Sequence, residues 1–326
     1  MGSTRHILQG LAAAAGIFLF LHAGAAAGAD EPKQDLVLRG DAKCTRCHDE
    51  GDDYPVLAIS QTRHGVKGDG RTPTCTSCHG ESDRHVNKPA NAVERPKVDF
   101  LFKGAGKSDA HSASERCLSC HEGAGKRMHW SGSQHESRDV ACTNCHTIHT
   151  PHDNVTDKVT QPEVCFACHK EQRSQIHKIS VHPVEAGKMA CSSCHNPHGS
   201  AGPALLVKNS VNETCYTCHA EKRGPFLWEH SPVFDNCTNC HQPHGSTNSP
   251  MLKARVPWLC QECHSGDHGA AINSGANLVN GAATTVNNLQ PLANQSPRAQ
   301  TNARACLNCH VMIHGSNHPA GAKYQR

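Results

Sequence analysis

Apolar residues are distributed unevenly along this chain. One long apolar run occupies residues 7–27, follows Arg5 and His6, and ends at the small residues Ala27-Gly28-Ala29. A basic start, an apolar middle and a small-residue cleavage site are typical of a secretory signal peptide, which we predict over residues 1–29. An uncleaved anchor is the alternative. No later stretch approaches the roughly 20 apolar residues that a membrane-spanning helix needs.

The remainder of the chain predicts short elements separated by turns. Asn, Pro and Gly are scattered through it, for example at Asn196-Pro197 and Gln242-Pro243, and predict turns. Short helices are expected at residues 163–171 and 212–223. Residues 86–110 and 269–303 form two long intervals for which a disordered loop is the default prediction, and a partner-docking surface is the alternative.

The composition is unusual for a protein that folds around its own side chains. Aromatic residues make up 4% of the sequence, and the mean hydropathy is −0.57. Such a chain buries too little apolar surface to offset its conformational entropy unaided. Something other than side chains must therefore supply much of the core.

The cysteines indicate what that component is. All 20 fall into ten Cys-x-x-Cys-His motifs, numbered here 1 to 10 in chain order. The cysteine pairs are Cys44 and Cys47, Cys75 and Cys78, Cys117 and Cys120, Cys142 and Cys145, Cys165 and Cys168, Cys191 and Cys194, Cys215 and Cys218, Cys237 and Cys240, Cys260 and Cys263, and Cys306 and Cys309. The adjacent histidines are His48, His79, His121, His146, His169, His195, His219, His241, His264 and His310.

This pentapeptide attaches c-type haem covalently through two thioethers, and its histidine becomes the proximal iron ligand. A disulfide scaffold and zinc sites are the alternatives, but neither requires a histidine after every cysteine pair. We therefore predict ten covalently bound haem c groups, whose porphyrins provide the missing apolar core. The formal charge of +3 says little about binding partners, because haem propionates would make the loaded protein anionic. Nucleic-acid binding has no support in the sequence.

A repeat in the sequence predicts the second iron ligands. Residues 135–149, 182–198 and 230–244 each contain a histidine, a haem motif and a further histidine, with a plain motif following at 23 or 24 residues. A looser copy starts at His64, and the first half of another copy closes the chain. The candidate distal ligands are His64, His85, His135, His149, His182, His198, His230, His244, His268, His314 and His318.

Those eleven histidines serve ten irons, and the sequence leaves open whether His268 or His318 is the tenth ligand. The leftover His111, His129, His152 and His177 are expected to be solvated surface side chains. Methionine is another possible distal ligand, but no methionine recurs at a fixed place in the repeat.

Iron with two histidine ligands has no open coordination position, and metal-centred catalysis needs one. Electron transfer is therefore favoured over an enzymatic role, with no catalytic acid or base. A multihaem reductase of nitrogen or sulfur oxides would need at least one iron with a free distal side. A periplasmic electron shuttle without a membrane partner is the other alternative.

Several stretches carry a resemblance to a known family. They are 195-HNPHGS-200, 215-CYTCHAEKRGP-225, 228-WEHSPV-233, 241-HQPHGS-246, 251-MLKARVP-257 and 312-MIHGSNHP-319. With ten haem motifs, these residues resemble the periplasmic decahaem cytochromes of the MtrA and DmsE family, which includes the iron-oxidation cytochromes MtoA and PioA. The likeness is densest from about residue 130 onward, and before Cys117 it depends mostly on the order of the motifs.

The resemblance implies a multihaem cytochrome c fold, in which short α-helices and extensive coil surround a linear haem chain with little β structure. It implies tandem pentahaem domains at 30–175 and 176–326. It also implies a periplasmic protein lodged in an outer-membrane β-barrel porin. Electrons would pass between periplasmic or inner-membrane cytochromes and an extracellular multihaem cytochrome or external iron mineral, in either direction.

Overall fold

The computed structural model describes residues 41–264, apart from 50, 53, 54 and 67, and residues 306–324, apart from 320. All of these belong to one compact unit, Val37–Arg326. The predicted signal peptide, the interval 269–303 and the candidate ligand His268 lie outside the described residues. Within the described ranges, no helix has both the length and the apolar character needed to cross a membrane.

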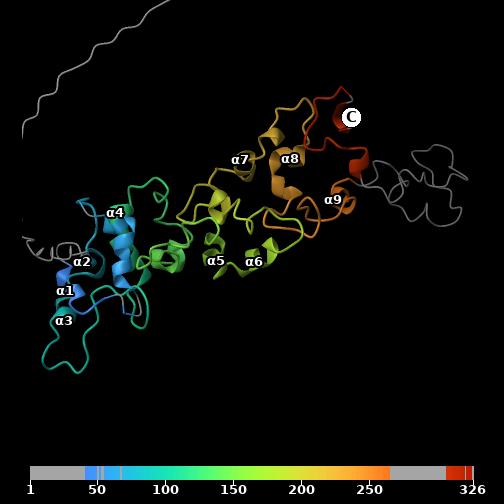
Figure 1. Ribbon diagram of the computed structural model, residues 1–326. Coiled ribbons are helices and arrows are strands. Elements are labelled where there is room, and N and C mark those ends of the chain that lie inside the picture. Colours follow the sequence, from blue (N-terminus) through green and yellow to red (C-terminus); the bar gives the residue numbers. More distant parts are fainter. Residues whose placement is uncertain are drawn as a thin grey trace, which may run out of the picture. The chain divides into compact units, whose positions relative to one another are not determined.

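Short helices and coil make up the described chain (Figure 1). The α-helices are α1 Ala42–Thr45, α2 Cys75–His79, α3 Asp83–Val86, α4 Ala110–His121, α5 Gln161–Phe166, α6 Lys170–Ile176, α7 Val211–Tyr216, α8 Ser231–Asp235 and α9 Trp258–Gln261. The 3₁₀ turns are η1 Val56–Gln61, η2 Arg63–Gly65, η3 Glu136–Arg138, η4 Cys142–Asn144, η5 Cys191–Ser193, η6 Pro203–Leu205, η7 Ala220–Lys222, η8 Cys237–Asn239, η10 Cys306–Asn308 and η11 Gly321–Lys323.

β structure in the described ranges consists of isolated bridges, such as those joining Ser180 to Ser246 and Trp228 to Ser316. Helix and coil with little β structure is the fold class that the sequence predicts, and it is confirmed.

Every haem motif forms one helical turn. In motif 4, the His146 amide donates to the Cys142 carbonyl at 2.9 Å, and the same bond recurs from His219 to Cys215. Motifs 2 and 3 lie within α2 and α4. Positions i, i+3 and i+4 share one helix face, so both cysteines and the histidine of a motif project to the same side.

The helices predicted at residues 163–171 and 212–223 each form as two shorter pieces. The first divides into α5 and α6, and the second into α7 and η7. Each division falls at the second cysteine and the histidine of the motif, where the backbone leaves helical geometry: His169 has φ −85° and ψ 67°.

Side chains alone form a small core. The buried apolar residues of the described chain are Ala58, Ala113, Trp130, Ala141, Phe166, Ile176, Ala190 and Leu252. Half of these are alanines, and they are spread along the chain. This scarcity fits a polypeptide that folds around a large non-protein component.

Part of the interval 86–110, for which a disordered loop was the default prediction, packs against motif 2. The His79 Nδ1 donates to the Phe100 carbonyl at 2.9 Å, and the Phe102 ring lies 5.2 Å from the His79 ring. The Arg116 guanidinium covers the Phe100 ring at 4.7 Å. The apolar patch at residues 100–102 therefore covers a haem motif.

A candidate multihaem cavity

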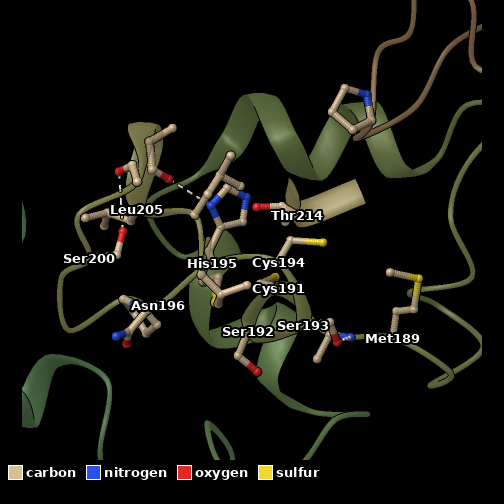
Figure 2. Close-up of a pocket in the computed structure, with 18 of the residues that line it drawn as sticks. Met189, Cys191, Ser192, Ser193, Cys194, His195, Asn196, Ser200, Leu205 and Thr214 are labelled. Atoms are coloured by element: carbon tan, nitrogen blue, oxygen red, sulfur yellow. Dashed lines mark hydrogen bonds between the residues drawn. The ribbon is translucent and has the colours of Figure 1, made fainter. Parts of the chain in front are cut away.

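A continuous cavity of about 4400 Å³ runs through the unit Val37–Arg326. Its walls carry cysteines and histidines of motifs 2 to 10, together with distal-ligand candidates. Figure 2 shows one wall, where Cys191, Cys194 and His195 of motif 6 lie close together beside Thr214. Most of the attachment and ligand groups predicted from the sequence thus face a shared space, whereas motif 1 lies outside its lining.

Nine motif histidines each face one distal-ligand candidate, and seven of these pairs line the cavity. The ring centroids of each pair are 5.8–6.3 Å apart. The pairs are His48 with His85, His79 with His149, His121 with His64, His146 with His198, His169 with His135, His195 with His244, His219 with His182, His241 with His314, and His264 with His230.

This spacing fits one metal ion between two imidazoles. A metal–imidazole bond measures about 2.0–2.1 Å, so two opposed bonds place the ring centroids about 6 Å apart. Rings in van der Waals stacking contact would come closer together. The paired histidines therefore suit the iron of a bis-histidine haem.

Hydrogen bonds set the tautomer of many of these rings. The His195 Nδ1 donates to the Ala204 carbonyl at 2.9 Å, and the His135 Nδ1 donates to the Pro197 carbonyl at 2.7 Å. A carbonyl can only accept, so Nδ1 carries the proton and Nε2 is left with a free lone pair for a metal. Burial, followed by repulsion from His146, lowers the pKa of His198 to about 4, which keeps that ring neutral.

The His-flanked motifs 2, 4, 6 and 8 take their partner histidine from the next copy of the repeat, whereas the plain motifs 3, 5, 7 and 9 take theirs from the same copy. His195 of motif 6 faces His244, which follows motif 8, whereas His219 of motif 7 faces His182, which precedes motif 6. The same rule relates His146 of motif 4 to His198, beyond motif 6. Each His-flanked motif in the interior therefore receives its partner histidine from the next copy of the repeat.

Cysteine contacts link consecutive motifs in chain order. The first cysteines of motifs 3 and 4 are hydrogen-bonded, and this contact raises the pKa of Cys117 and lowers that of Cys142. First cysteines also meet between motifs 1 and 2, 5 and 6, 7 and 8, and 9 and 10. Second cysteines interact between motifs 2 and 3, 4 and 5, 6 and 7, and 8 and 9.

Buried polar side chains hold four of the five first-cysteine contacts, and sequence reasoning missed them. The Asn212 Oδ1 accepts the Cys237 amide at 2.7 Å, and the Asp41 Oδ1 accepts the Cys75 amide at 2.7 Å. Ser114 and Gln161 act similarly on motifs 4 and 6. All four precede a plain motif by three or four positions, and that shared position is the only sequence signal they offer.

The remaining histidines divide into two groups. His310 and His318 lie in the described chain, His268 lies outside it, and the choice of the tenth distal ligand stays a prediction. The leftover His111, His129, His152 and His177 are all exposed, as expected, and His177 forms an ion pair with Glu185 at 2.8 Å.

The alternatives for the cysteines find no support in the described ranges. All twenty cysteines are free of disulfides there. Across the same ranges, no group of three or more His, Cys, Asp or Glu residues gathers around one point as a zinc site would require.

Comparison with known proteins places the chain in a family. It is 44% identical over 295 residues to the multiheme cytochrome MtrA of Shewanella baltica (strain OS185), covering 88% of this chain and 82% of that protein. The chain belongs to the MtrA family of multihaem cytochromes. The resemblance predicted from the sequence is thereby confirmed, and the MtrA-family chain is a c-type cytochrome that transfers electrons through covalent haem.

Other similarities cover parts of this MtrA-family chain. Residues 182–224 and 230–269 match the doubled CXXCH motif, and residues 75–161 match the cytochrome c-type protein NrfB-like family. The cytochrome c-type protein NrfB of Haemophilus influenzae is 27% identical over 164 residues, covering 44% of this chain and 71% of that protein. The high-molecular-weight cytochrome c of Nitratidesulfovibrio vulgaris is 22% identical over 214 residues, covering 65% of this chain and 35% of that protein.

Proposed function

We propose that this chain is a periplasmic decahaem conduit that carries electrons across the outer membrane inside a β-barrel porin. Ten covalent haem c groups attach to the ten motifs, and each iron is held by the motif histidine and a distal histidine. Its partners are the porin, periplasmic or inner-membrane cytochromes, and an extracellular multihaem cytochrome or external iron mineral. Electrons travel outward in metal reduction or inward in iron oxidation.

The observation that carries this proposal is the row of nine histidine pairs on motifs linked in chain order. Haem bound there supplies reversible one-electron chemistry. The residues orient the iron ligands through Nδ1 hydrogen bonds and hold neighbouring motifs in contact. No catalytic acid or base is assigned, because the paired imidazoles would hold the iron from both sides and leave no open position for a substrate.

The haem count and the ligation are tested on the purified holoprotein. Intact mass should equal the mature polypeptide plus ten haems. Electron paramagnetic resonance should show low-spin ferric iron throughout. A mass corresponding to far fewer haems would contradict the decahaem assignment, and a substantial high-spin signal would favour a reductase with an open iron.

The transmembrane role requires a separate reconstitution. Liposomes containing the porin, this cytochrome and the outer cytochrome should oxidise an internal reduced dye when an external acceptor is added. Liposomes without the porin serve as the control. Failure of the cytochrome to co-purify with a barrel, together with no electron transfer across the liposome, would leave a periplasmic shuttle as the function.

A further inference from the structure

Two motif histidines hydrogen-bond to carboxylates instead of backbone carbonyls. The His146 Nδ1 donates to the Asp153 Oδ2 at 2.6 Å, and the other oxygen of Asp153 accepts the Thr147 amide at 3.2 Å. Asp153 is thereby fixed by the residue that follows the histidine, with its charge directed at the ring that faces His198.

Motif 1 has the same arrangement. The His48 Nδ1 donates to the Asp52 Oδ2 at 2.9 Å, and the same oxygen accepts the Asp49 amide at 3.2 Å. The aspartates lie four and seven positions after their histidines, so the recurring geometry does not come from one repeated sequence pattern.

Four other motif histidines have neutral partners, and the His219 Nδ1 lies 3.8 Å from the Glu221 Oε1, beyond hydrogen-bond distance. His79, His195, His241 and His310 donate from Nδ1 to the carbonyls of Phe100, Ala204, Pro250 and Lys323. Motif 3 carries the opposite charge: the Arg127 Nη2 lies 3.3 Å from the His121 Nδ1, and the Arg127 Nε donates to the His121 carbonyl at 3.0 Å. Motifs 3 and 4 are in contact through their first cysteines, so a cation and an anion stand at adjacent proximal ligands.

The electronic consequence follows from the bond to the iron ligand. A carboxylate that accepts the Nδ1 proton makes the imidazole a stronger donor and adds negative charge, and both effects favour ferric over ferrous iron. Charge-assisted hydrogen bonds are also shorter and stronger than those to a neutral carbonyl. A guanidinium beside the ring has the reverse effect.

We propose that Asp153 and Asp52 lower the reduction potentials of the haems at motifs 4 and 1, and that Arg127 raises that of the haem at motif 3. The conduit then has a built-in potential step between motifs 3 and 4. This inference rests on the proposed bis-histidine ligation.

Burial ranks the two carboxylates. The Asp153 and His146 side chains are 20% and 33% exposed. The Asp52 and His48 side chains are more exposed, at 38% and 44%. Water and salt screen an exposed charge more strongly. The effect of Asp153 therefore exceeds that of Asp52.

The test is a potentiometric titration of the holoprotein monitored by electron paramagnetic resonance. Asp153→Asn keeps an acceptor for Nδ1 and removes the charge. One component of the titration should move to higher potential, and its low-spin g values should approach those of the haems whose motif histidines donate to backbone carbonyls. Asp52→Asn should produce a smaller shift of the same sign in a different component, and Arg127→Gln should shift a third component downward.

Asp157→Asn is the matched control, because this exposed carboxylate accepts the Val159 amide and touches no motif histidine. Its titration should match that of the wild type. An Asp153→Asn protein that keeps all its low-spin haems and titrates like the wild type would overturn the tuning proposal. A high-spin signal in the wild-type protein would overturn the proposed ligation instead.

Discussion

At the scale of single residues, the glycine after two of the distal candidates, His198 and His244, is required by close backbone packing. Gly199 and Gly245 have φ of +107° and +140°, a region that favours glycine. A Cβ on Gly199 would lie 2.0 Å from the His129 carbonyl oxygen, and a Cβ on Gly245 would lie 2.1 Å from that of Gln175. The repeated His-Gly-Ser thus fixes the loop that presents the histidine.

Gly245→Ala should destabilise the holoprotein and disturb the iron facing His244. The left-handed conformation costs alanine about 1–3 kcal/mol, and the clash with Gln175 adds to this. The measurement is chemical denaturation followed by haem absorbance. Gly104→Ala is the control, because φ is +85° there and nothing lies within 4 Å of an added Cβ. Equal losses in both variants would show that the clash contributes nothing.

Sequence reasoning found the attachment residues and the pool of candidate ligands, but it could not pair them. The motif Cys and His are recognisable because covalent attachment demands adjacent residues in fixed order. His195 and His244 are 49 positions apart, and only the folded chain brings them together. Asp41 and Asn212 each accept the amide of a first cysteine in the next motif, but they are different residue types. No single residue type therefore marks this position in the sequence.

At the scale of elements, buried polar side chains align one motif turn with the next. Asn212 in α7 is 8% exposed. Its Nδ2 donates to the Val233 and Phe234 carbonyls at 3.0 and 2.8 Å, while its Oδ1 accepts the Cys237 amide. One amide therefore joins α7, α8 and η8.

Asn212→Ala should lower the free energy of unfolding by about 1–3 kcal/mol for each buried backbone group left without a partner. It should also loosen the contact between motifs 7 and 8. Denaturation midpoints measure the first effect, and the magnetic coupling between the two haems measures the second. The exposed Asn209→Ala, which removes the same amide nearby, should change neither. Unchanged stability in Asn212→Ala would show that these bonds are replaced by water.

The helix pattern was only partly predictable, for a local reason. Short helices at motifs 5 and 7 were expected as continuous segments, but each divides where the motif histidine turns its ring toward the cavity. Helix propensity reflects the local sequence alone and takes no account of where the motif histidine must point. Here the ring orientation is set by what it faces across the cavity, which local sequence does not encode.

At the scale of the whole molecule, the exchange of histidines between repeats ties the motifs into one structure. His146 faces His198, and the His135 Nδ1 bonds to the Pro197 carbonyl, so contacts cross the predicted domain boundary near residue 175. That boundary stays a prediction. The sequence shows the repeat clearly, yet it does not show that ligands are exchanged between its copies.

His244→Ala should create one high-spin iron among the proposed ten, located at motif 6 and not at motif 8. Electron paramagnetic resonance gives the spin state. Adding Cys191→Ala and Cys194→Ala, which remove the motif 6 haem, should abolish the new signal. Adding Cys237→Ala and Cys240→Ala should leave it in place, and the reverse result would show that His244 serves its own motif. His177→Ala should produce no high-spin iron, because His177 is exposed and pairs with Glu185.

The exchange of histidines also affects the order in which the haem sites are completed during synthesis and export. Under the proposed export into the periplasm with the N-terminus leading, His195 emerges before His244, and a haem attached to motif 6 during export would lack its second ligand until His244 arrives. That iron would spend the interval with one face exposed to whatever small molecules are present. The second iron ligands would therefore bind in chain order, each one after the segment that carries it has been translocated.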